Sequence, residues 1–191
     1  MSSNKLNRRE LNMNKRVIII NFDPQWPTLY EKEKELICRT LGQRIRAIEH
    51  IGSTAVPNLG GKNIIDIMVG VNNLDEANEC LSPLERIGYT DVSPQPAPDN
   101  AEWYYCLGKG HHSAGYHLHL VKFESEHWKK HIIFRDFLRK NPEIAKDYFN
   151  LKKELAAKYG TDRLGYTEAK SAFIELVIAK AKRLEHGSLG C

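Results

Sequence analysis

The chain has 191 residues, of which 41% are hydrophobic and 27% charged, and its formal net charge is +4 at pH 7. These values are typical of one globular domain, and they exclude a disordered chain and a membrane-spanning protein, because no apolar run is long enough to cross a bilayer. The small positive net charge is compatible with an acidic small-molecule ligand. Acidic residues alternate with the lysines of the C-terminal half, which disfavours a nucleic-acid-binding surface. The four cysteines include no CxxC pair and favour a cytoplasmic location.

The chain divides into a short leader, one domain and a short tail. Residues 1–16 are polar and basic, so we expect a flexible leader, followed by a single domain over 17–185 and a frayed tail over 186–191. After the turn at 23–27, apolar residues recur with a helical period until Gly42. The pattern therefore predicts a first helix that ends at this glycine.

Two strands and a second helix follow. Residues 44–51 alternate between the two faces of an extended segment, and 63–71 form a continuous β-branched run, which is typical of a central strand. Apolar residues at helical spacing predict a helix over 74–87, with Asn72 or Asn73 as its N-cap.

The second half changes from strands to helices. The Pro-rich piece 93–98 lacks the donors of a β-ladder, so we predict a surface loop there. Strands are expected at 103–107 and 116–123, with a hairpin connection over 108–115. Three helices are predicted at 126–140, 143–159 and 167–184. Strands first and helices last indicate an α+β protein, with a mixed sheet, flanking helices and a C-terminal helical group.

The loop between the first two strands has the composition of a phosphate-binding turn. Gly52 permits a tight turn, and Ser53 and Thr54 offer hydroxyl and amide donors at the start of a short helix. Lys62 is a further candidate phosphate contact, and His50 is a candidate cap of the loop. An ordinary capped loop and a solvated lysine are the alternatives.

Asp66 is a lone acid within the apolar strand that follows this loop. An ionised carboxylate in such a position needs a cation or strong donors to offset its desolvation. We therefore interpret it as a metal-binding or catalytic acid, with a structural acid that accepts hydrogen bonds from a nearby loop as the alternative.

An ordered set of motifs runs along the chain: FDPQWP at 22–27, EHIGSTAVP at 49–57, KNIIDI at 62–67, HLH at 117–119, FRDFLR at 134–139 and YTEAK at 166–170. Together these motifs resemble the GrpB family, which is related to the nucleotidyltransferase fold of the polymerase-beta superfamily. The similarity runs from about Val17 to Arg183.

The resemblance implies a metal-dependent site from which this chain departs. Active transferases of that fold hold two divalent metals with a D-x-D pair and a third acid on a neighbouring strand. Asp66 matches the first acid, but Met68 replaces the second and cannot bind a hard cation. The third acid's strand carries His117 and His119 instead, which favour softer metals or could donate hydrogen bonds to phosphate directly. Glu49 is a candidate for the missing carboxylate, with a structural role as the alternative.

Further candidates lie on the late helices. Arg135 could bind a triphosphate, with an ion pair to an acid of the next helix as the alternative. For Tyr166, Lys170 and the pair Lys152–Lys153, contact with a nucleotide and helix packing are both open. We retain Arg135 and Lys170 as ligand-binding candidates. His127 and His131 are one helical turn apart but lack the acid of an H-E-x-x-H motif, so they do not predict a metal site.

These candidates lead to one functional hypothesis. We expect a protein that binds a nucleoside triphosphate or another phosphorylated ligand and, if it is a transferase, uses Ser53, Asp66 and His119 as its catalytic groups. Mg²⁺ or Mn²⁺ is then the expected cofactor, with Asp66, Glu49, His117 and His119 as candidate ligands. The alternatives are an inactive nucleotide- or cofactor-binding module and an assembly partner.

Overall fold

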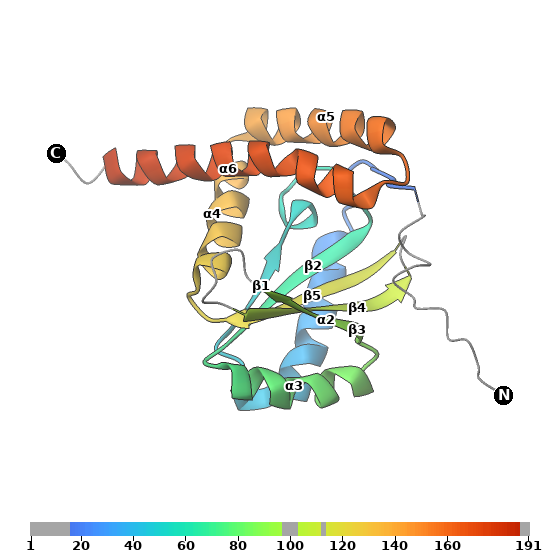
Figure 1. Ribbon diagram of the computed structural model, residues 1–191, viewed down its shortest axis with the longest axis vertical. Helices are drawn as coiled ribbons and strands as arrows, with labels where there is room; N and C mark the ends of the chain where they lie inside the picture. The colour runs from blue at the N-terminus through green and yellow to red at the C-terminus, as the bar shows by residue number, and fades with distance from the viewer. Residues whose placement is uncertain (1–15, 97–102, 112–113, 188–191) are drawn as a thin grey trace.

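Five strands form one mixed sheet at the centre of the protein (Figure 1). The computed structural model describes residues 16–96, 103–111 and 114–187. The sheet order is β1-β2-β5-β4-β3, in which β2 and β5 are parallel and the other neighbours antiparallel. The strands are β1 (Ala47–Ile51), β2 (Ile64–Val71), β3 (Thr90–Pro96), β4 (Trp103–His111) and β5 (Ala114–Lys122).

Helices α2 (Trp26–Leu41) and α3 (Leu74–Arg86) cover one face of the sheet (Figure 1). Proline in the first turn starts α2, and the Asn73 side chain accepts a hydrogen bond from the backbone of Glu76 at the start of α3. The alternate residues of β2 that face these helices are apolar and buried, which explains its β-branched run. Both predicted helices are confirmed.

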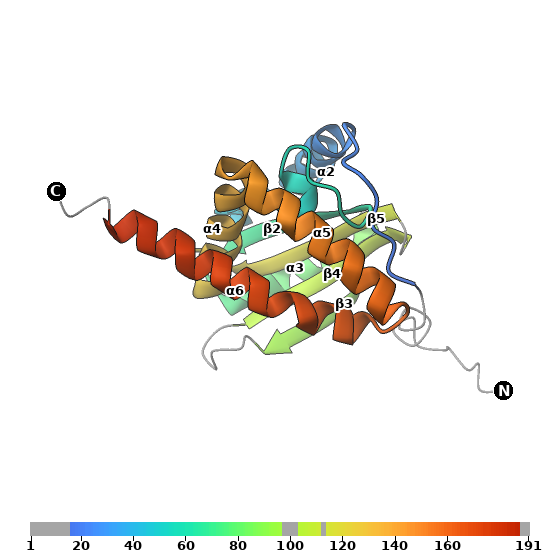
Figure 2. The same cartoon turned by 90° about the horizontal axis from the view of Figure 1, so that it is seen from above.

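Helices α4 (Glu126–Lys140), α5 (Pro142–Tyr159) and α6 (Arg163–Gly187) lie on the opposite side, as the view from above shows (Figure 2). Ser125 caps α4, and Pro142 starts α5. The third predicted helix begins four residues earlier than expected, because Asp162 accepts hydrogen bonds that start α6 ahead of Gly165. No helix in the described ranges combines the length and apolarity needed to cross a membrane.

The α+β class is confirmed, whereas three local predictions around the sheet were wrong, and residues 186 and 187, predicted as part of a frayed tail, belong to α6. Residues 93–96 belong to edge strand β3 rather than to a loop; an edge strand tolerates proline because one side of its backbone needs no partner. The hairpin connection is shorter than 108–115, because β4 continues to residue 111 and β5 starts at 114. The extended segment begins at Ala47, since 42–44 form a 3₁₀ turn.

Some predictions concern residues outside the described ranges. These are most of the leader, positions 97–98 of the predicted Pro-rich loop, the centre of the hairpin at 112–113 and the last four residues of the tail.

Candidate functional site

The loop after β1 and the acid on β2 lie against each other. Gly52 has φ of +70°, and Ser53–Ala55 form a single 3₁₀ turn. A Cβ atom added to Gly52 would lie 2.5 Å from Oδ2 of Asp66. Only glycine fits here, because a side chain would meet both an unfavourable backbone conformation and the carboxylate. The two features that the sequence predicts as a phosphate loop and a functional acid are therefore neighbours.

Asp66 lies at the centre of this region with two histidines beside it. The parallel register pairs Asp66 with His117, and His119 is two residues further along the same face of β5. Asp66 Oδ1 is 3.4 Å from His117 Nδ1 and 4.0 Å from His119 Nε2. Burial alone would raise the pKa of Asp66, but the hydrogen bond from His117 and the charge of Lys62 contribute to lowering it to about 2. The carboxylate is thus ionised at neutral pH.

Lys152 on α5 reaches the same loop from above the sheet. Its side chain is 2% exposed, and its Nζ lies 2.7 Å from Ser53 Oγ and also donates to the carbonyl of Gly60. The approach requires Gly61, because a Cβ there would lie 2.9 Å from the Ser53 Cβ and 3.5 Å from the lysine Nζ. Burial, followed by the charges of neighbouring lysines, lowers the pKa of Lys152 to about 7.

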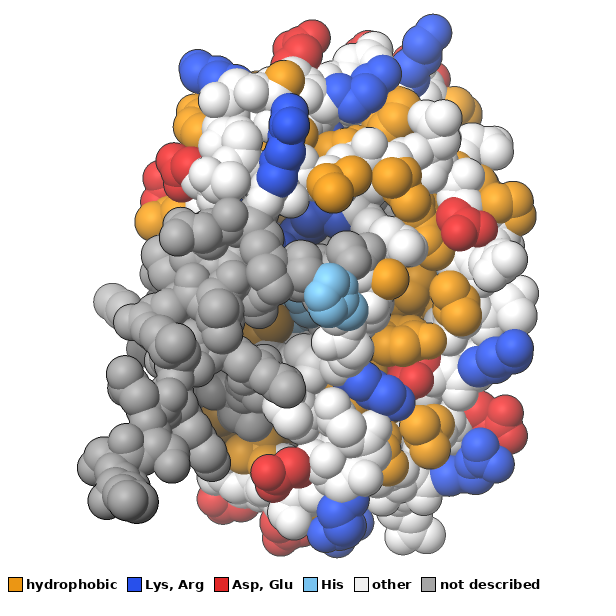
Figure 3. All heavy atoms as spheres, turned by 90° about the vertical axis from the view of Figure 1, so that its right-hand side faces the viewer, with side chains coloured by type: hydrophobic (Ala, Val, Ile, Leu, Met, Phe, Trp, Pro, Cys, Tyr) orange, Lys and Arg blue, Asp and Glu red, His pale blue; other side chains and the backbone are white. Residues whose placement is uncertain are grey.

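Two further lysines complete what we call the lysine cluster, defined as Lys62, Lys152 and Lys170. Burial, with the charge of Lys62, lowers the pKa of Lys170 to about 8. Burial also lowers the pKa of Lys62, although Asp66 acts in the opposite direction. The side of the molecule where α5 ends and α6 begins is hollowed, and basic and histidine side chains lie together in the hollow (Figure 3).

Sequence reasoning left the role of Lys152 open. It lies on the buried stripe of α5, one turn from Tyr148 and one turn from Ala156, and its Nζ is 4.7 Å from the centre of the Tyr148 ring. A lysine at a position where the helical period demands an apolar residue was the available signal.

Glu49 and Arg135, two predicted site residues, bind each other. Arg135 Nη1 lies 2.6 Å from Glu49 Oε2 and 3.0 Å from the His50 carbonyl, and its Nε lies 2.7 Å from Asp136 Oδ1. The arginine is 7% exposed, so these contacts join α4 to β1. The structure therefore places both residues in a helix-to-strand ion pair.

Three histidines pack together beside Asp66 on the α4 side. The ring centres of His127 and His131 are 4.4 Å apart, and those of His119 lie 6.3 and 5.8 Å from them. Burial lowers the pKa of His119 to about 4 and that of His127 to about 3. These imidazoles are therefore neutral at pH 7 and contribute no charge to the site.

His50 occupies the position predicted for a loop cap. Its Nε2 lies 2.9 Å from Thr54 Oγ1, and its ring stacks on Tyr30 with centroids 4.4 Å apart. Burial lowers its pKa to about 4. A neutral imidazole thus fixes the loop that presents Ser53.

The residues present do not fit the pair of metal ions that the fold family implies. Met68 is 0% exposed, and Glu49, which lies opposite it on β1, is paired with Arg135. Within the described part of the chain, no group of three or more His, Cys, Asp or Glu residues has an arrangement that could hold a metal ion. Of the predicted set, Asp66, His117 and His119 lie together, whereas Glu49 is held by Arg135.

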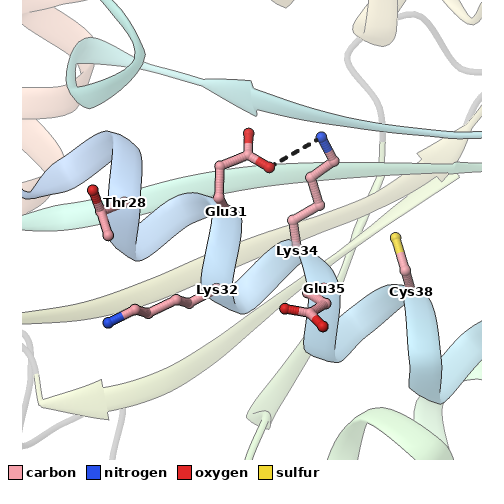
Figure 4. Close-up of a pocket in the computed structure, with 6 residues that line it drawn as sticks. All are labelled: Thr28, Glu31, Lys32, Lys34, Glu35 and Cys38. Atoms are coloured by element: carbon pink, nitrogen blue, oxygen red, sulfur yellow. Dashed lines mark ion pairs between the residues drawn. The ribbon is translucent and has the colours of Figure 1, made fainter.

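A second concave region lies on the outer surface of α2 and has a different character (Figure 4). Its charged side chains include Lys34 and Glu31, which form an ion pair of 3.3 Å. All its lining residues belong to one helix, so it is a shallow groove between surface side chains and forms no part of the site around Asp66. The residues that line it are Thr28, Glu31, Lys32, Lys34, Glu35 and Cys38.

Comparison with known proteins places the chain in a family. The family model described as "GrpB protein" matches residues 16–180. The glutamate-rich protein GrpB of Alkalihalophilus pseudofirmus is 33% identical over 163 residues, which cover 85% of this chain and 94% of that protein. The crystal structure of the conserved protein GrpB from Enterococcus faecalis superposes with a TM-score of 0.75 at 32% identity, over 88% of this chain and 99% of that one.

A more distant likeness supports the nucleotidyltransferase-like fold. The polymerase core of TRAMP, an RNA surveillance complex, superposes with a TM-score of 0.51 at 12% identity, over 79% of this chain and 50% of that one. Such a likeness concerns the fold alone. Together with the mixed sheet and its two helical layers, these matches show that the chain belongs to the GrpB family.

Proposed function

We propose that this protein binds the phosphate groups of a nucleotide or a related phosphorylated ligand. The observation that carries the proposal is an imbalance of charge: the buried Lys152 donates to Ser53, the charges of Lys62 and Lys170 act on it, and Asp66 is the carboxylate that opposes the pKa shift of all three lysines. When all three lysines are protonated, their positive charge exceeds the single negative charge of Asp66.

Several protonated lysines close to one another and partly shielded from water raise the free energy of the ligand-free protein. Burial withdraws water from each ammonium group, and the lysines repel one another, which is why the pKa values of Lys152 and Lys170 fall to about 7 and about 8. A phosphate group carries a complementary charge and accepts several hydrogen bonds. Bound beside Ser53, it would accept from the hydroxyl and from the ammonium group 2.7 Å away.

Nucleotidyl transfer is a second candidate, and Asp66 is the observation that favours it. The carboxylate is ionised, lies beside the Ser53 loop and occupies the position of the first metal-binding acid in the family resemblance. Met68 in place of the second acid argues against a two-metal mechanism. We therefore place binding ahead of turnover.

A thermal-shift screen tests the proposal. The four nucleoside triphosphates and coenzyme A are each added to the protein, with and without Mg²⁺ or Mn²⁺. A ligand at 100 times its Kd adds about 2.7 kcal/mol, which is a rise of roughly 5–10 °C in Tm for a domain of this size. The absence of a shift with every ligand would contradict the proposal and favour the assembly-partner alternative.

Matched variants locate the binding. Lys170→Met and Ser53→Ala are expected to lose most of the shift, whereas Lys153→Met removes one charge from the exposed side of α5 and should keep it. Release of pyrophosphate from a triphosphate would establish turnover. Release that survives in Asp66→Asn would exclude the catalytic role assigned to that acid.

A further inference from the structure

We infer that the lysine cluster takes the place of divalent metal ions, so that the site binds a diphosphate group in its metal-free form. This inference rests on the proposed function and specifies the ionic form of the ligand. A second acid two residues after Asp66 on β2 would allow the site to bind a cation. That position holds Met68, which packs with Ile51, Val121 and Trp128 in an apolar cluster and is 0% exposed.

The remaining carboxylates do not restore a cation site. Glu49 lies directly opposite Met68 on β1, but its Oε2 lies 2.6 Å from Arg135 Nη1. Asp66 therefore provides one negative charge, and its histidine neighbour His119 is half-buried and neutral. A divalent cation prefers several oxygen ligands, which this arrangement does not offer.

Positive charge arrives instead from three different segments of the chain. Lys62 precedes β2, Lys152 comes from the middle of α5, and Lys170 comes from the first half of α6. The contact between Lys152 and Ser53 spans 99 positions of sequence, so the packing of α5 on the Ser53 loop creates it. An ammonium group placed beside the phosphate loop supplies the charge that a metal would otherwise bring.

Other polar groups face the lysine cluster from several elements. These groups are Asp66 on β2, Cys106 on β4, His117 and His119 on β5, Tyr148 on α5, and Arg163 and Tyr166 on α6. The charged ones among them, Asp66 and Arg163, act on the pKa of Lys62 in opposite directions.

The test uses inorganic pyrophosphate as the probe, titrated calorimetrically into the whole protein with EDTA or with excess MgCl₂. Mg²⁺ neutralises part of the probe's charge, so we expect affinity at least tenfold higher in EDTA. A site built for metal ions would show the opposite order. Binding that requires Mg²⁺ would overturn this inference while leaving phosphate binding intact, and failure to bind in both conditions would overturn it as well. The nucleotide screen judges the proposed function separately.

Variants and protons show whether the lysines act directly. Lys170→Met is expected to weaken pyrophosphate binding in EDTA at least tenfold, whereas the exposed Lys153→Met should change it less than twofold. Lys152→Met provides a second test, provided its circular dichroism matches that of the wild type.

Titration at pH 8 in two buffers of different ionisation enthalpy should reveal uptake of about one proton as lysines regain charge. Equal binding by wild type and Lys170→Met, or no proton uptake, would contradict the inference.

Discussion

Replacing Lys152 by Met should change how the stability of the protein depends on pH. The lysine releases its proton at about pH 7 in the folded protein, whereas an unfolded lysine keeps it until about 10.5. Between these values, unfolding takes up one proton, so raising the pH disfavours unfolding. Methionine has no proton to exchange and suits the apolar stripe of α5. The wild type should therefore gain stability with pH relative to the variant.

The size of the effect follows from the two pKa values. For a pKa of about 7 in the folded state and 10.5 in the unfolded state, this one group raises the free energy of unfolding by about 2 kcal/mol between pH 7 and pH 9. Because the side chain is 2% exposed, solvent screens the effect little.

Urea unfolding followed by tryptophan fluorescence measures it, in buffers without phosphate at pH 7, 8 and 9. The quantity compared is the difference in free energy of unfolding between wild type and Lys152→Met. Lys153→Met is the control. Because Lys153 is exposed, its substitution should change the free energy of unfolding by an amount that does not vary with pH. A constant difference for Lys152→Met as well would refute a lowered pKa at this position.

Two further predictions concern the loop and the ion pair that joins α4 to β1. Gly52→Ala should cost about 3 kcal/mol, because it adds a contact of 2.5 Å with Asp66 to backbone strain, whereas Gly42→Ala has strain alone and should cost about 1–2 kcal/mol in urea unfolding. Equal costs would argue against the close approach. Arg135→Gln should cost about 1–3 kcal/mol by the same measurement, because the arginine is buried but its carboxylate partners are partly exposed. Arg39→Gln breaks an exposed pair and should cost about 0.5 kcal/mol or less. A loss for Arg135→Gln no larger than that for Arg39→Gln would show that the partly buried pair contributes little.

The helices and the central strand could be predicted from the sequence, because burial of one face makes apolar residues recur at the spacing of a helix or of a strand. Strand β2 is apolar on the face toward α2 and α3, and α3 has both its stripe and its cap in the sequence. The failure at β3 has a physical cause. The rule that excludes proline from a sheet holds for central strands, and nothing local in 93–96 reveals that the segment lies at the edge.

The site was predictable where its parts are close in sequence and only partly so where packing brings them together. Gly52, Ser53 and Asp66 lie on one loop and the strand that follows, so their adjacency was within reach of sequence reasoning. The pairing of Arg135 with Glu49 spans 86 positions and depends on how α4 docks, which no spacing encodes. It removes from the metal-ligand hypothesis the one acid that the sequence offered as a substitute.

The methionine on β2 and the buried lysine on α5 are both consistent with a site in which lysine charge replaces metal ions. An acid at Met68 would lie on the same face as Asp66 and draw cations to the site, whereas the apolar side chain leaves a single negative charge there. Lys152 then adds positive charge at a position where an apolar residue would fill the helix stripe at no desolvation cost. A protein that had simply lost catalysis would gain stability by replacing this lysine. Its burial against Ser53 is the observation on which the proposed anion site rests, and a pyrophosphate affinity that falls when Mg²⁺ is added would be the direct test of that proposal.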